Sequence, residues 1–160
     1  MRFTLIKDIK QDVGMKSVLS GLLIFTILYI IVDYFVKQSG FGVSPESVAL
    51  TLFGNPDEFL DPMSPSSFLE FAHIEIFFIM MILLTLSAVY IRMSNKRIHS
   101  ILIVNIATLG ALVSLVALGG AYYFHEGFVG VYVVGSFVWR SLAFYMSVYS
   151  LWRLHFATSL

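Results

Sequence analysis

The strongest constraint on this chain is a set of four apolar segments, each as long as a membrane-spanning helix. A helix of about 20 residues crosses the roughly 30 Å hydrocarbon core of a bilayer. Of the 160 residues, 58% are apolar and only 12% are charged, which is more apolar surface than a soluble domain of this size hides. Because backbone polar groups in lipid must be satisfied within the segment, we interpret these runs as α-helices. The predicted spans cover residues 17–36, 66–91, 98–124 and 128–152.

The spans use nearly all of the chain, which predicts a single integral membrane domain over residues 1–160. The connections at 93–96 and at Glu126 and Gly127 are short. Short connections place spans two, three and four as sequential antiparallel neighbours. The predicted fold is therefore all-α: a polytopic membrane protein whose four transmembrane helices form an antiparallel bundle.

Basic residues near the span ends predict the orientation, because Lys and Arg are retained on the cytoplasmic side. The opposite side carries Lys37 as its single basic residue. Together with the even number of spans, this places both chain ends in the cytoplasm. We expect the chain in the bacterial inner membrane, with loops 1 and 3 on the external, periplasmic side. Eight of the ten basic residues lie on the predicted cytoplasmic side: Arg2, Lys7, Lys10, Lys16, Arg92, Lys96, Arg97 and Arg153.

Two further helices are predicted outside the spans. From Phe3 to Val13, apolar residues recur at helical spacing among charged ones, which is typical of a short amphipathic helix on the cytoplasmic membrane surface. In loop 1, Ser44 followed by Pro45 is a helix start signal, and Gly54 is a stop signal. The sequence therefore predicts a short external helix that ends at Gly54.

A few ionisable residues fall inside the apolar spans, where they usually face the bundle interior, pair with each other or carry function. At about 1.5 Å of rise per residue, they cluster in the outer half of the predicted membrane. Arg140 is the most deeply placed charge, and we expect Asp33 or Glu75 to be its partner. Such a pair could carry function or only fix the order of the helices. The five residues are Asp33, Glu70, His73, Glu75 and Arg140.

Glu70 and His73 have the Glu-x-x-His spacing with which bundle helices bind transition metals. Asp33 from span one, and His125 or Glu126 from the outer turn, could complete the coordination. A b-type haem held between His73 and His125 is the related hypothesis, although it would need a kinked or tilted helix. The leading functional hypothesis is thus a metal or haem site that serves electron transfer in the membrane.

A second hypothesis is quinone or proton handling without a metal, as in a small subunit of a respiratory complex. Titratable groups and aromatic walls at membrane depth would suit that role. The residues that support it are Asp33, His73, Glu75 and Arg140, with tyrosines that include Tyr29 and Tyr132.

A third hypothesis is a structural or assembly protein with no cofactor. Small residues between Ala107 and Ala121 would permit close helix packing, within the chain or in a homo-oligomer. Cysteine is absent, which excludes disulfides and thiolate chemistry, and the net charge of zero gives no reason to expect nucleic acid as a partner. The sequence carries no phosphate loop, dinucleotide fingerprint or nucleophile elbow, so whether the chain is an enzyme is left open.

Overall fold

The four predicted spans are confirmed as long helices. A computed structural model describes residues 13–94 and 97–156 of the chain. Each of its four long helices has at least 27 residues and is apolar enough to cross a membrane. The predicted surface helix from Phe3 to Val13 lies outside the described residues, apart from Val13 itself. The elements are α1 (Val13–Ser39), α2 (Pro45–Phe53), η1 (Pro56–Glu58), α3 (Pro65–Met93), α4 (Arg97–Tyr123) and α5 (Phe128–His155).

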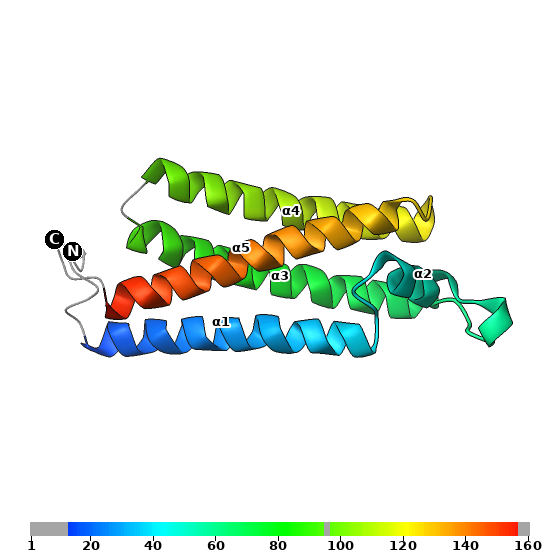
Figure 1. Cartoon of the computed structure of the whole chain (residues 1–160), viewed down its shortest axis with the longest axis horizontal. Helices are drawn as coiled ribbons and strands as arrows, with labels where there is room; N and C mark the ends of the chain where they lie inside the picture. The colour runs from blue at the N-terminus through cyan, green and yellow to red at the C-terminus, as the bar shows by residue number, and fades with distance from the viewer. Residues whose placement is uncertain (1–12, 95–96, 157–160) are drawn as a thin grey trace.

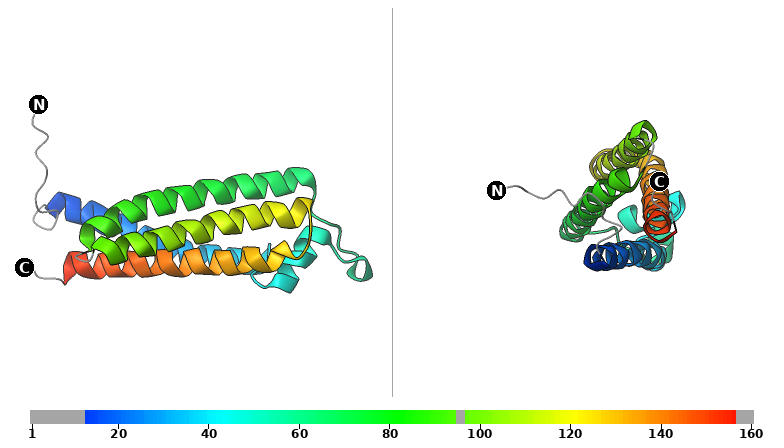
Figure 2. Two further views of the ribbon diagram at one scale, coloured as in Figure 1. Left: turned by 90° about the horizontal axis from the view of Figure 1, so that it is seen from above. Right: turned by 90° about the vertical axis from the view of Figure 1, so that its left-hand side faces the viewer.

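The long helices lie side by side along one axis, and α2 and η1 lie at one end of them (Figures 1 and 2). The start of α1 and the end of α5 both lie at the opposite end, because a chain that runs back and forth an even number of times ends on the side where it began (Figure 1). There the hydroxyl of Ser20 is hydrogen-bonded to Nε2 of His155, 2.8 Å away, which joins α1 to α5. We call the two ends of the molecule the α2 end and the terminal end.

Helices α4 and α5 make the closest approach in the bundle, because small residues face each other along their contact. A Cβ atom added to Gly135 would lie only 2.9 Å from the carbonyl oxygen of Gly110. Next to this point, the hydroxyls of Ser114 and Ser136 are hydrogen-bonded at 2.7 Å. The small residues of the third predicted span thus pack within the chain, as helix interfaces in membranes commonly do.

The short helix predicted in loop 1 is present as α2. The Ser44 side chain accepts a hydrogen bond from the backbone N–H of Ser47, Pro45 is the first helical residue, and Gly54 ends the helix at a φ of 72°. Val48 and Leu52 are buried, so one face of α2 packs on the bundle. This helix therefore covers the end of the bundle nearest to the charged residues described below.

The sidedness of the membrane stays a prediction that cysteine labelling can test, because the chain has no cysteine of its own. We expect a membrane-impermeant thiol reagent to label an Asp57→Cys variant in intact spheroplasts. An Arg97→Cys variant should be labelled only after the cells are lysed, since Lys and Arg near span ends are retained in the cytoplasm. The opposite pattern would show that the α2 end faces the cytoplasm.

Candidate functional site

Four charged side chains from three helices form one closed network between α1, α3 and α5. The Nζ of Lys37 donates to Oε2 of Glu75 and lies 3.5 Å from Oδ2 of Asp33. On the other side, Arg140 donates from Nε to Asp33 and from Nη2 to Glu75, both at 3.0 Å. Each acid therefore contacts both bases, and each base contacts both acids.

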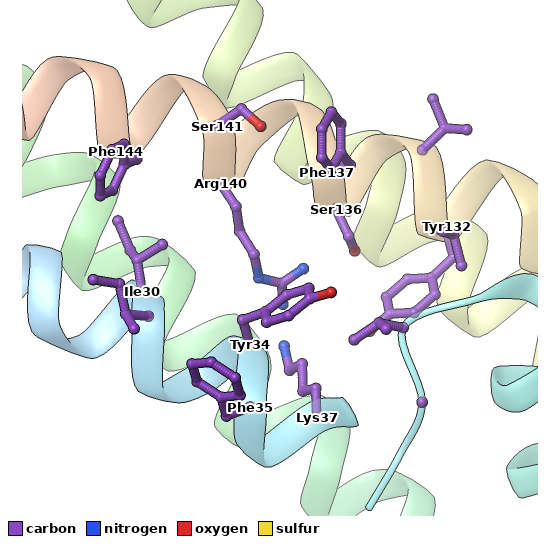
Figure 3. A pocket seen from close by; sticks show the side chains of 15 residues that line it. Ile30, Tyr34, Phe35, Lys37, Tyr132, Ser136, Phe137, Arg140, Ser141 and Phe144 are labelled. Carbon is purple, nitrogen blue, oxygen red and sulfur yellow. The ribbon is translucent and has the colours of Figure 1, made fainter. Parts of the chain in front are cut away.

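The network exists because of where these residues fall on their helices. Asp33 and Lys37 are one turn apart on α1, so their side chains share one face. Glu75 lies on the buried face of α3, and Arg140 extends from α5 toward α1 (Figure 3). Charged side chains from three helices thus meet, and their ion pairs join α1 to α3 and α5.

All four side chains are largely removed from solvent, with exposed fractions of 8% for Lys37, 6% for Glu75, 13% for Asp33 and 15% for Arg140. Aromatic rings lie beside both cations. The Arg140 guanidinium is 4.8 Å from the ring centroid of Trp139, and the Lys37 ammonium is 5.8 Å from that of Phe71. Burial of this kind is tolerated only when each charge is paired, and here every charge has two partners.

The structure resolves which acid pairs with Arg140. The sequence left Asp33 and Glu75 as alternatives, and the guanidinium contacts both. Lys37 is the member of this network that the sequence did not assign to the candidate site. Its spacing of four residues from Asp33 predicts that both residues lie on one inward-facing stripe of span one, but no spacing predicts its contact with Glu75 on another helix.

The structure does not bring together the four residues predicted to bind a metal or haem. Glu70 and His73 are exposed on the outward side of α3, and His125 is exposed in the turn before α5, where its Nδ1 accepts a hydrogen bond from Gly127. Asp33 is instead held by Lys37 and Arg140. Among the described residues, no group of three or more His, Cys, Asp or Glu side chains could hold a metal ion. The residues predicted to bind a metal ion thus form no such group within the described chain, because the i, i+3 spacing fixes a shared face but not its direction. Haem binding stays a prediction.

The supporting residues of the predicted site divide in the same way. Tyr132 is buried and contacts the ring of Phe41 edge-on, and Tyr29 stacks on Phe78 at a centroid distance of 4.9 Å. Of the residues expected to support the predicted site, Arg140 and Glu75 thus belong to the charge network, the two tyrosines lie near it, and Glu126 is exposed in the turn before α5.

A groove of about 610 Å³ lies between α1 and α5, next to the network. Its walls are mainly apolar and aromatic, and several of the rings at its rim are exposed, such as Phe137 at 73%. Arg140 and Lys37 point toward one another across it, with the ring of Tyr34 beside them (Figure 3). The groove is thus open on the side of the bundle and ends on two cations.

Of the four charged residues in the network, only the two bases line the groove. Lys37 and Arg140 line it, together with the hydroxyl residues Ser136 and Ser141, whereas Asp33 and Glu75 do not. An ammonium and a guanidinium together carry more N–H donors than the four contacts to the acids use. A molecule in the groove would therefore meet hydrogen-bond donors, with the carboxylates placed behind them.

A comparison with known protein families agrees with the membrane fold. The family Aq_1264_TM, described as a transmembrane helical domain, matches residues 42–159, a range that begins before α2 and includes α3, α4 and α5. The chain has no significant match among the curated proteins or among the solved structures. Since the family match covers well over half of the sequence, the chain belongs to the Aq_1264_TM family of transmembrane helical domains and is an integral membrane protein.

Proposed function

We propose that this protein binds a lipid-soluble amphiphile in the groove between α1 and α5, with the polar head of the ligand against Lys37 and Arg140. The observation that carries the proposal is the groove itself, which has apolar walls and two cations at its base. Small-molecule sites are commonly apolar concavities of about 300–1,000 Å³ with a few polar groups that orient the ligand. Both the size and the lining of this groove fit that description.

The bilayer is the natural source of such a ligand. The rim includes exposed apolar side chains from both helices, among them Phe35, Val134 and Phe137. In a membrane these side chains contact acyl chains, so an amphiphile can enter sideways without crossing water. Polar groups at this depth are costly unless they are paired or bind something, which is why intramembrane charges commonly mark a binding pathway.

A structural role is the second candidate, and one observation favours it. The network joins α1 to both α3 and α5, so it could serve only to fix α1 in the bundle. A purely structural network does not require donors that face an open groove. Electron transfer through a metal or haem, and assembly with respiratory-complex subunits or with a second copy, stay predictions.

Filling the groove tests the proposal. Ser141 is exposed and lines the groove, so Ser141→Trp should occupy the space of a ligand without disturbing the buried core. We expect mass spectrometry of the protein, purified in native lipid nanodiscs, to find a bound amphiphile on the wild type that is largely lost from this variant.

The matched control is Val116→Trp, which adds the same ring to an α4 position that is 75% exposed and does not line the groove. This variant should keep the ligand. Equal amounts of ligand on both variants, or no ligand on the wild type, would contradict binding in the groove and favour the structural role.

A further inference from the structure

We infer that the ligand has an uncharged, planar head with acceptor oxygens and an apolar tail, as an isoprenoid quinone has. This inference rests on the proposed function, because it names the ligand class of the same groove. It follows from three features of the groove: the donors that it presents, the net charge of the network and the aromatic walls.

The donors select for a head that accepts hydrogen bonds. Arg140 and Lys37 face the groove, and both keep N–H groups that none of the four contacts to Asp33 and Glu75 uses. A carbonyl oxygen can accept from such groups without displacing a carboxylate. Both donors lie against the same oxygen of Asp33, so they sit side by side and suit one carbonyl oxygen of the head, such as a quinone carries.

The net charge of the network disfavours an anionic head. Two acids balance two bases, so the cations that line the groove carry no surplus positive charge. An anion in the groove would leave one negative charge unbalanced at membrane depth, where isolated charges are costly. A fatty acid or a lipid phosphate would carry that cost, whereas a neutral quinone head would not.

The walls suit a flat ring and an apolar tail. Tyr34 and Phe35 from α1, and Tyr132 and Phe137 from α5, offer aromatic faces and edges on both sides of the groove. Along α5 the lining continues to Phe144, about 18 Å beyond Tyr132 at the usual helical rise. The last part of this path, toward the terminal end, is apolar and would hold the first units of an isoprenoid tail.

Tryptophan fluorescence provides a direct test, because quinones quench indole emission at short range. The chain has two tryptophans, and Trp139 lies beside Arg140. In a Trp152→Phe background in nanodiscs, we expect a short-chain ubiquinone to quench Trp139 emission saturably. An alkyl sulfonate of similar tail length, which is a permanent anion, should compete with it about tenfold more weakly or worse.

A change of network charge provides the second arm. Asp33→Asn leaves the network with a surplus positive charge, so the affinity for the sulfonate relative to that for the quinone should rise. The matched control is Glu46→Gln, which makes the same charge change on an exposed residue of α2 and should alter neither affinity.

The outcomes separate the two proposals. If the sulfonate binds more tightly than the quinone, the quinone assignment is wrong and groove binding stands, provided that Ser141→Trp abolishes it. If neither probe binds, the quinone assignment is overturned, and the proposed function is then decided by whether mass spectrometry finds an amphiphile on the wild type that Ser141→Trp loses. Should Asp33→Asn fail to fold, the comparison of the two probes on the wild type alone still decides the charge of the head.

Discussion

Replacing Glu75 with Gln is expected to lower the free energy of unfolding by about 3–5 kcal/mol, because removal of one partner leaves buried charges uncompensated. Glu75 is the acid that contacts Lys37 and Arg140 from α3, and its side chain is the least exposed of the four. Gln keeps the shape and one acceptor oxygen, so the loss would come from the charge. Denaturant titration of the protein in detergent micelles, followed by far-ultraviolet circular dichroism, would measure it.

A charge-balanced double variant separates the charge from the packing. Lys37→Met with Glu75→Leu removes one base and one acid that contact each other, and it leaves Arg140 paired with Asp33 at 3.0 Å. Replacement of a buried ion pair by apolar side chains is often neutral or stabilising. We therefore expect the double variant to unfold close to the wild type. A loss as large as that of Glu75→Gln would show that the network stabilises through its geometry and not through charge balance.

The contrast between these variants also bears on function. If the double variant is as stable as the wild type, the second acid and base are not needed to hold α1 in place. The presence of Lys37 in the groove would then require another reason, and a ligand that accepts its hydrogen bond supplies one. Stability of the double variant combined with loss of quinone quenching would be the result that best supports the binding proposal.

The helical spans were predictable because their signal is local. An apolar run of sufficient length specifies a helix in lipid wherever the rest of the chain lies. The same is true of α2, whose boundaries follow from Ser44, Pro45 and Gly54. The residues that determine where these helices form therefore lie within the helices themselves or next to their ends.

The site was less predictable because it depends on the rotation and tilt of each helix. Spacing shows that Glu70 and His73 share a face of α3, but only packing shows that this face points out of the bundle. Similarly, Glu75 turns inward because the apolar residues Ile79, Ile82 and Leu86 on its side of α3 are buried in the core. Spacing also places Lys37 on one stripe of α1 with Asp33, but only packing shows that Glu75 of α3 reaches it and that the lysine stays inside and does not extend to the interface.

The contact between α4 and α5 leads to the second large effect, which is expected for Gly135→Ala. The new Cβ would meet the carbonyl oxygen of Gly110 and the backbone of Ser114, at 2.9 and 3.1 Å. These are backbone atoms of a packed helix and cannot rotate away, so the two helices must separate. Overpacking of this kind typically costs about 1–3 kcal/mol, and the displacement should also weaken the hydrogen bond between the hydroxyls of Ser114 and Ser136.

Gly130→Ala is the matched control, since Gly130 lies on the same helix with no atom within 4 Å of the added Cβ. Ala has the higher intrinsic helix preference, by about 0.5–1 kcal/mol in a helix interior, and Gly130 gains less of it because it lies in the first turn of α5. A Gly135→Ala variant that is nevertheless less stable than Gly130→Ala in the same detergent therefore reports the interhelical contact. If Gly135→Ala were as stable as Gly130→Ala, α4 and α5 would not approach each other as closely as the structure shows, and the packing that positions Arg140 would have to be revised.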